Sequence, residues 1–220
     1  MAGWLTFQSK YDINLKHTFQ IYTTFADIMA RNVEFDEDRA IQKAMEVFWR
    51  KGYGGASMRD LTDAMQINAS SLYNTIGDKH QLFIKCITNY VHTRMEETLA
   101  HSSKIKSPIK AVIGLINDCV NTILYSDNHC LAIKTTFELA STDPDIKVLL
   151  KQDSDFTHGF LLKLIQQAIE LKEITSDTDA ETLTSFILSA FTGWHESYII
   201  HHDPVRIKKM AKYLITQISQ

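Results

Sequence analysis

The residues best suited to chemistry lie in a short polar stretch, residues 69–75, between two more apolar parts of the chain. Its polar side chains are Ser70, Ser71, Tyr73, Asn74 and Thr75. Small hydroxyl and amide groups allow close approach to a nucleic-acid duplex, where they can hydrogen-bond to base edges or phosphate oxygens. A helix this short is unstable alone, so neighbouring elements must hold and display it.

Helix-capping signals mark the elements that would hold this stretch. Ser57 with Asp60 forms a capping box, Asn68 can cap the polar stretch, and Gly77 can end it. Helices are also predicted on both sides by these further signals: Asp36 as a cap, Gly52 as a stop, and Asp78 with Gln81 as a reciprocal cap. The predicted order is therefore three helices with short turns, followed by a fourth that reaches about residue 100.

The joint between the second and third helices is Gln66-Ile67-Asn68, which gives the layout of a helix-turn-helix. A small core against the first helix can form from Met58, Leu61, Ala64, Met65, Ile67, Leu72 and Ile76. Residues 36–85 contain seven basic and seven acidic side chains. Binding to DNA would therefore depend on the placement of charges rather than on a bulk positive field.

The rest of the chain has similar helix-capping signals. Helix starts are predicted at Ser107-Pro108, at Asp143-Pro144, at Thr178 with Glu181, and at Asp203-Pro204. No strand alternation and no internal repeat is found. The sequence predicts an all-α protein with about nine helices, comprising an N-terminal three-helix helix-turn-helix domain and a larger helical domain.

Composition fits a protein of this kind. The chain has 220 residues, a net charge of −3 and a hydrophobic fraction of 45%. Its three cysteines, without CxxC spacing, fit a reducing cytosol, and no apolar run is long enough to span a membrane. We expect a cytoplasmic location. Residues 1–30 are expected to be an N-terminal extension, not native or poorly ordered; the alternative is a short helix packed on the domain.

Few other residues suggest chemistry. The glycine-rich residues 51–55 are not followed by the G-K-[ST] of a phosphate loop, so we interpret them as a turn. His195 and His202 are seven residues apart, but no carboxylate or thiol completes a metal site. We therefore expect neither a metal nor a cofactor, and no catalytic residues. The alternative function is an all-α enzyme or a protein-interaction module with a coincidental helix-turn-helix-like front end.

The stretch AIQKAMEVFWRKGYGGASMRDLTDAMQINASSLYNTIGDKHQLF, residues 40–83, resembles the DNA-binding domain of the TetR family of transcriptional regulators. The matching features are the KGY turn, Ser57, the S-S-L-Y core and the G-D-K entry to the fourth helix. Residues 130–146, CLAIKTTFELASTDPDI, resemble one subfamily more weakly. The family often has glycine where this chain has Gln66, and a non-glycine residue there costs about 1 kcal/mol if the backbone is left-handed.

The resemblance implies a ligand-responsive repressor that a small molecule releases from its operator. It divides the chain into residues 31–80 for DNA binding and residues 81–220 for ligand binding and dimerisation. The DNA-contacting residues it implies are Ser57, Met58, Arg59, Ala69, Ser70, Ser71, Tyr73, Thr75 and Lys79. Arg59 could bind guanine, while Tyr73 and Lys79 could bind phosphates. The alternative is that Arg59 and Lys79 are ordinary solvated charges.

The C-terminal part is expected to form a homodimer that binds a palindromic operator. The predicted helix from about residue 178 to 201 is apolar on nearly every side, which leaves one face for a partner; the alternative is a single large core. The predicted interface residues are Leu183, Phe186, Ala190, Ile207, Met210 and Leu214. By resemblance, the two copies pair as a four-helix bundle.

The same region is expected to bind an apolar or mixed small molecule, because it contains more large, soft side chains than a tight helical core requires. The predicted ligand-binding residues are Tyr90, Cys119, Tyr125, Phe137, Phe156, His158, Trp194 and His195. Each could instead belong to an ordinary core.

Cys130 lies at a predicted helix start, beside His129. Helix-start amides and a protonated histidine favour a thiolate, so Cys130 is a candidate sensor of oxidants or electrophiles. The alternative is a small side chain that fills a packed corner. Cys119, on an apolar helix face, is expected to be inert by comparison.

Overall fold

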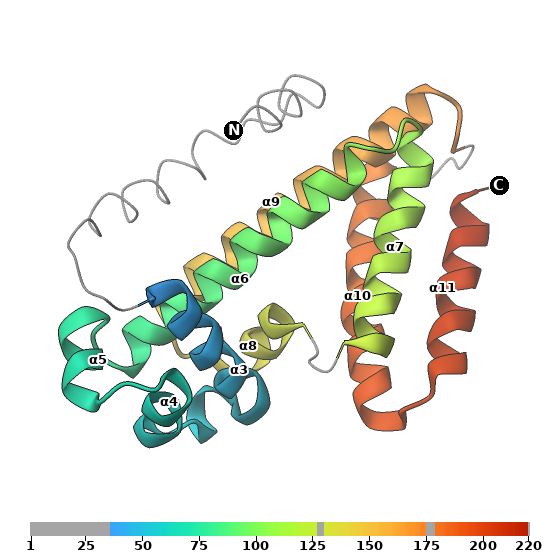
Figure 1. Ribbon diagram of the computed structural model, residues 1–220. Helices are drawn as coiled ribbons and strands as arrows, with labels where there is room; N and C mark the ends of the chain where they lie inside the picture. Colours follow the sequence, from blue (N-terminus) through green and yellow to red (C-terminus); the bar gives the residue numbers. More distant parts are fainter. Residues whose placement is uncertain (1–35, 127–129, 175–178, 220) are drawn as a thin grey trace. The chain divides into compact units, whose positions relative to one another are not determined.

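The computed structural model describes residues 36–126, 130–174 and 179–219. These residues form nine α-helices and no strand, as the sequence predicts (Figure 1). The helices are α3 (Glu37–Gly55), α4 (Met58–Met65), α5 (Ala69–Thr75), α6 (Lys79–Ser102), α7 (Pro108–Tyr125), α8 (Leu131–Leu139), α9 (Pro144–Glu170), α10 (Ala180–His201) and α11 (Pro204–Ile218). Among the described residues, none of the helices combines the length and apolar character needed to cross a bilayer. The expected N-terminal extension, residues 1–30, lies outside the described residues.

The helix starts follow the predicted capping chemistry. The Asp36 carboxylate accepts a hydrogen bond from the Arg39 amide at 3.1 Å. Side-chain caps also begin α4, α5, α7 and α11, at Ser57, Asn68, Ser107 and Asp203. Each cap satisfies amides that the first helical turn would otherwise leave without a partner.

One predicted cap is wrong. The sequence pattern assigned the start of α10 to Thr178 with Glu181, but the N-cap is Asp179, whose carboxylate accepts from the Thr182 amide at 2.8 Å. A carboxylate at the cap also interacts favourably with the helix dipole, which a threonine hydroxyl does not.

The described chain divides into two compact units. Unit 1 comprises residues 36–93 and 134–152, and unit 2 comprises residues 94–133 and 153–219. Helices α6, α8 and α9 each contribute residues to both units. This division by contacts differs from the predicted functional division near residue 80, which stays a prediction.

The core of unit 1 joins α3, α4 and α5 to the first half of α6. Phe48 on α3 and Phe83 on α6 pack edge to face, with ring centroids 4.7 Å apart, and both are fully buried. Leu61 on α4 and Leu72 on α5 are also fully buried. These four side chains hold the short helices against the longer ones.

Unit 2 is a separate helical bundle in which α7, α10 and α11 pack against one another (Figure 1). Its core includes Ile116 and Ile123 from α7, Ile187 from α10 and Ile207 from α11, all buried. Most of the residues buried along α7 recur every three or four positions, as expected of a helix that buries one face.

Candidate nucleic-acid interface

Helix α5 packs against its neighbours through one buried residue, Leu72. Leu72 is fully buried, and Ile76, just after the helix, is 6% exposed. Ser70, Tyr73 and Asn74 are exposed, with Tyr73 at 55%. Seven residues cannot form a stable helix alone, so packing of Leu72 and the cap at its start fix its position. The helix thus presents a polar face to its surroundings, which explains the polar stretch in the sequence.

The turn between α4 and α5 has a left-handed residue at its centre. Gln66 adopts φ 58° and ψ 39°, and the following Ile67 amide donates to the Thr62 carbonyl at 3.1 Å. The backbone at Gln66 is therefore left-handed, which is the condition under which a non-glycine residue is costly there. A side chain in this region costs about 1 kcal/mol, which the fold must offset elsewhere.

The start of α4 is held by a network around Asp60. Its carboxylate accepts from the Ser57 amide at 2.9 Å and from Lys51 Nζ at 2.5 Å, while Ser57 Oγ accepts from the Asp60 amide at 3.1 Å. The hydrogen bond from Lys51 and those from Ser57 lower the pKa of the Asp60 carboxyl. The network positions the first turn of α4, which carries Arg59.

Arg59 extends from that turn into solvent. Its side chain is 89% exposed and lies 3.7 Å from the Asp63 carboxylate, one helical turn away. An exposed ion pair of this kind contributes little stability, so the guanidinium can exchange partners. Arg59 is consequently available to a nucleic acid at low energetic cost.

Gly77 connects α5 to α6 and has a backbone that favours glycine. Its φ is +109°, and a Cβ there would lie 1.6 Å from Gln81 Oε1. Gln81 needs that position because its Oε1 accepts from the Asp78 amide at 3.0 Å, and Asp78 in return accepts from the Gln81 amide at 2.9 Å. The reciprocal cap predicted at the start of α6 is therefore confirmed.

Lys79, the first residue of α6, lies over an aromatic ring. Its Nζ is 4.5 Å from the centroid of the Tyr53 ring, and the Tyr53 ring centroid lies 5.0 Å from that of Phe83. Cation–π contact restricts the lysine without neutralising it. The sequence did not indicate this role for Tyr53, which appeared only as part of a turn.

All nine residues predicted to contact DNA are exposed or half-buried. Ser57, Arg59, Ala69, Ser70 and Tyr73 are exposed. Met58, Ser71, Thr75 and Lys79 are half-buried, and the Thr75 hydroxyl donates to the Ser71 carbonyl at 2.7 Å. These positions lie on the first turn of α4, on α5 and at the start of α6, all within unit 1. Their contacts with DNA stay a prediction.

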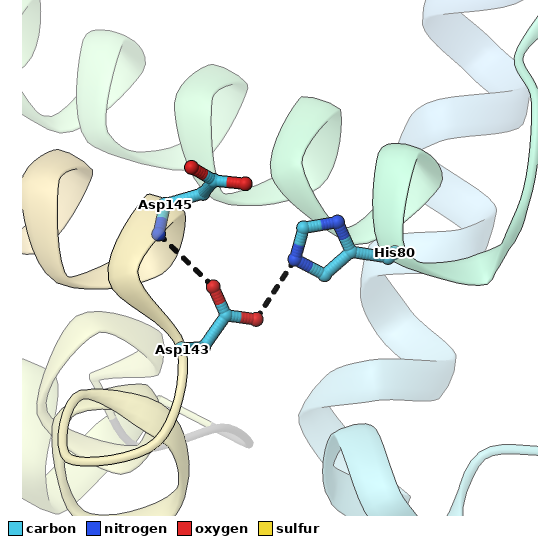
Figure 2. Close-up of side chains that lie close together, drawn as sticks. All are labelled: His80, Asp143 and Asp145. Atoms are coloured by element: carbon cyan, nitrogen blue, oxygen red, sulfur yellow. Dashed lines mark hydrogen bonds and ion pairs between the residues drawn. The ribbon is translucent and has the colours of Figure 1, made fainter.

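His80 joins the start of α6 to the start of α9 (Figure 2). Its Nε2 lies 2.8 Å from Asp143 Oδ2, while Asp143 Oδ1 accepts from the Asp145 and Ile146 amides at 3.1 Å. Burial raises the pKa of Asp143, but the hydrogen bonds from Ile146 and His80 outweigh it and the net shift is downward. His80, Asp143 and Asp145 could ligate a metal, with donor atoms within 4.8 Å of one another. Both Asp143 oxygens are already hydrogen-bonded, so the arrangement works without an ion.

The predicted ligand-binding residues do not share one environment. Phe156, Trp194 and His195 are buried, and Tyr90, Cys119 and His158 are half-buried. Tyr125 is 69% exposed and Phe137 is 73% exposed, so neither is enclosed. Tyr90 and Phe137 belong to unit 1 and the other six to unit 2. The structure thus gives unit 2 the larger share of the candidate ligand site.

The two histidines singled out in unit 2 bond within the protein. His158 Nε2 lies 3.1 Å from a Glu181 carboxylate oxygen, and His195 Nδ1 lies 2.9 Å from the Phe191 carbonyl. The sequence missed a partly buried polar cluster on α6 and α9: Arg94 forms an ion pair with Asp153 and donates to the Thr157 hydroxyl at 2.9 Å. The apolar residues around these positions gave no sign that distant charged groups would meet there.

The cysteines of unit 2 differ in their surroundings. Burial raises the pKa of the Cys119 thiol, and the nearby Cys130 adds to that shift. Cys130 is half-buried and immediately precedes α8. Its expected partner His129 lies outside the described residues.

An open apolar groove runs between α10 and α11. It is lined by Phe186, Ala190, Trp194, Lys209, Met210, Tyr213 and Leu214. Phe186 is 61% exposed and Tyr213 68% exposed, although both are large and apolar in character. Of the predicted interface residues, Leu183, Ile207 and Leu214 are buried within the chain, whereas Phe186 is exposed and Ala190 and Met210 are half-buried.

Unit 1 consists of short capped helices that present a polar helix, and unit 2 is also all-helical. This arrangement defines the class of helix-turn-helix DNA-binding proteins. Comparison with known families narrows this class. Residues 40–86 match the family described as bacterial regulatory proteins of the tetR family, and residues 110–214 match the tetracyclin repressor-like C-terminal domain. The chain belongs to the TetR family of transcriptional regulators.

Individual relatives agree with this assignment. The chain is 28% identical to the uncharacterized HTH-type transcriptional regulator YezE of Bacillus subtilis, over 72% of this chain and 84% of YezE. It is 26% identical to the HTH-type transcriptional repressor ComR of Escherichia coli, over 72% of this chain and 77% of ComR.

Two solved structures share the fold. A cysteine mutant of the TetR-family regulator CifR, complexed with 26-bp operator DNA, is similar with a TM-score of 0.73 at 24% identity, covering 84% of this chain and 98% of CifR. FadR from Bacillus subtilis, in complex with stearoyl-CoA, is similar with a TM-score of 0.69 at 13% identity, covering 84% and 98% of the two chains.

Proposed function

We propose that this protein is a homodimeric repressor that binds a palindromic operator and leaves it when a small molecule binds unit 2. The observation that carries the proposal is the exposed polar face of α5, held by Leu72 and by the cap at Asn68. A helix presented in this way by a TetR-family chain is suited to the DNA major groove. The proposal includes no catalytic activity, because the family consists of transcriptional regulators.

On the operator, the proposed contacts divide into two kinds. Arg59 is the candidate for direct base recognition, because it is long, exposed and only weakly paired with Asp63. Tyr73 and Lys79 are candidates for phosphate contacts, which fix the position of the protein without reading the sequence. Equal numbers of acidic and basic residues in this region make specific placement more important than overall charge.

For dimerisation we propose the groove between α10 and α11 as the shared surface. Exposed Phe186 and Tyr213 supply apolar area that a second copy would bury, and half-buried Met210 lines the same groove. Buried Leu183, Ile207 and Leu214 would support this surface from inside the chain. A two-fold dimer would place the two α5 helices about 34–36 Å apart, or a multiple of that distance, on the operator.

For the effector we propose unit 2, around Phe156, Trp194, His195 and Cys119. Arg94 is a further candidate there, because an anionic group on a ligand could compete with Asp153 for it. Since FadR is described with stearoyl-CoA, acyl-CoA thioesters are a first class of compound to test. Coupling of about 1–3 kcal/mol between the two sites would change operator affinity roughly 5- to 150-fold.

DNase footprinting of the purified protein on the DNA upstream of its own gene tests the proposal. We expect one protected palindromic region that disappears when an effective ligand is added. If no region is protected at micromolar protein, the DNA-binding part of the proposal is wrong. If protection occurs but no acyl-CoA or cell extract changes it, the ligand-release part is wrong.

A further inference from the structure

The last residues of α3, beyond the kink at Gly52, hold a carboxylate from a distant part of the chain. The backbone amides of Tyr53 and Gly54 donate to the two oxygens of Glu138, at 3.1 Å and 2.8 Å. Glu138 lies on α8, and both partners belong to unit 1. Two successive amides that converge on one anion form a nest, which is a specific arrangement rather than a chance surface contact.

This segment is shaped to receive the carboxylate. Gly52 adopts φ +74°, and a Cβ at Gly52 would lie 3.0 Å from both Glu138 oxygens. Glycine therefore serves two purposes here, since it permits the left-handed backbone and leaves room for the carboxylate.

A second side chain of α8 contacts the same end of α3. Lys134, one turn before Glu138, donates from its Nζ to the Trp49 carbonyl at 2.6 Å. The Lys134 cation binds a backbone carbonyl, which carries a partial negative charge. The Glu138 anion binds backbone amides, which carry a partial positive charge. Helix α8 thus holds the end of α3 with two charged groups of opposite sign.

The residue held by Glu138 connects directly to the proposed DNA-binding surface. The Tyr53 ring lies beneath Lys79 Nζ, with 4.5 Å between the nitrogen and the ring centroid, and it also packs against Phe83. Displacement of the Tyr53 backbone would move the ring and remove the support for Lys79. Glu138 is therefore linked to Lys79 through Tyr53: its carboxylate binds the Tyr53 amide, and the Tyr53 ring contacts Lys79.

We propose that Glu138 is a positioning residue for operator binding, which acts through Tyr53 to orient Lys79 toward a DNA phosphate. The inference rests on the proposed function, in which Lys79 contacts the operator. Because Glu138 is exposed and bonds to exposed amides, its loss should affect the position of Lys79 more than the global stability of the fold.

The test is a double-mutant cycle with full-length protein and the footprinted operator, measured by fluorescence anisotropy. Glu138→Ala is expected to weaken binding about tenfold, and Lys79→Met by a similar factor. Since both act through the same phosphate contact, the double variant should bind within about twofold of Lys79→Met alone. Glu138→Gln, which keeps one oxygen acceptor, should recover part of the lost affinity.

Two controls separate positioning from general damage. Glu46→Ala removes an exposed glutamate of α3 that pairs with Lys43, one helical turn away, at 3.2 Å, and it should leave affinity unchanged. Amide hydrogen exchange at residues 53–54 should accelerate in Glu138→Ala, while exchange in the core of α6 stays at the wild-type rate.

Two results would overturn the inference in a wild-type protein that binds the operator. One is additive losses of affinity in the double variant, and the other is unchanged affinity in Glu138→Ala despite faster amide exchange at residues 53–54. Absence of any operator binding by the wild-type protein would instead refute the proposed function on which the inference rests.

Discussion

Replacement of Gly77 by alanine tests how the display of α5 is built. Gly77 has φ +109°, and the new Cβ would lie 1.6 Å from Gln81 Oε1. Backbone strain for a non-glycine residue in this region costs about 1–3 kcal/mol. The flexible Gln81 side chain would also have to move, which removes the hydrogen bond it accepts from the Asp78 amide, worth about 1 kcal/mol.

Together these effects should destabilise the protein by about 2–4 kcal/mol, or roughly 4–16 °C in melting temperature for a chain of this size. Urea and thermal unfolding followed by circular dichroism measure the loss. Gly159→Ala is the matched control: no heavy atom lies within 4 Å of its Cβ position in α9, so a gain of up to about 1 kcal/mol is expected.

A second variant separates the two contributions. Gln81→Ala alone should cost about 1 kcal/mol through the lost cap, but it should cost nothing further in the Gly77→Ala background, where that cap is already broken. A loss of less than about 0.5 kcal/mol in Gly77→Ala, or a full Gln81→Ala cost in both backgrounds, would refute this explanation.

Four further predictions concern the interface and its supports. Arg59→Ala should relax base preference at one operator position and cost about 1–3 kcal/mol of binding free energy. Lys79→Ala should weaken binding to all duplexes alike and flatten the salt dependence. Unaltered operator binding in both variants would mean that the DNA-binding surface lies elsewhere. Gln66→Gly should stabilise the protein by up to about 1 kcal/mol, because Gln66 is left-handed at φ 58°; chemical denaturation measures the gain, and a loss would contradict it. The lowered pKa of Asp143 stabilises the fold above its ordinary value of 3.8, and this contribution is lost as pH falls through the lower folded-state pKa. Asp143→Asn should therefore be less stable than wild type at pH 5, with the difference shrinking toward pH 2; an unchanged difference in acid titrations would disprove the assignment. If Cys130 senses oxidants or electrophiles, Cys130→Ser should stay on the operator when peroxide releases the wild type; release of both proteins in the same anisotropy assay would exclude the thiol switch.

Much of unit 1 could be predicted because its signals are local. The caps at Asp36, Ser57 and Asn68 each depend on residues within one helical turn of the chain. Such signals can be recognised without knowing the fold. The stop predicted at Gly52 is instead a kink with φ +74°, and α3 continues to Gly55. The one cap predicted at the wrong residue, Thr178 instead of Asp179, involved two neighbouring residues that can both cap a helix.

The contacts that sequence could not predict join residues far apart in the chain. Glu138 meets Tyr53 across 85 residues, and His80 meets Asp143 across 63. An exposed glutamate on a short helix has the same local pattern as a solvated one, so only the fold identifies its partner. The exposure of Tyr125 and Phe137 could not be predicted for a similar reason. Hydrophobicity indicates a tendency toward burial, but it does not show which face of a helix a neighbouring element covers.

We propose that the surface formed by Arg59 on α4 and by the polar face of α5 reads a specific DNA sequence. The most direct test is the ratio of affinities for the footprinted operator and for a scrambled duplex of equal length, measured by anisotropy over a range of salt concentrations. We predict binding to the operator with a Kd on the order of 10⁻⁸ M or tighter at physiological salt, and at least about 10³-fold weaker binding to the scrambled duplex. Equal affinity for the two duplexes at every salt concentration would contradict sequence-specific recognition by this surface.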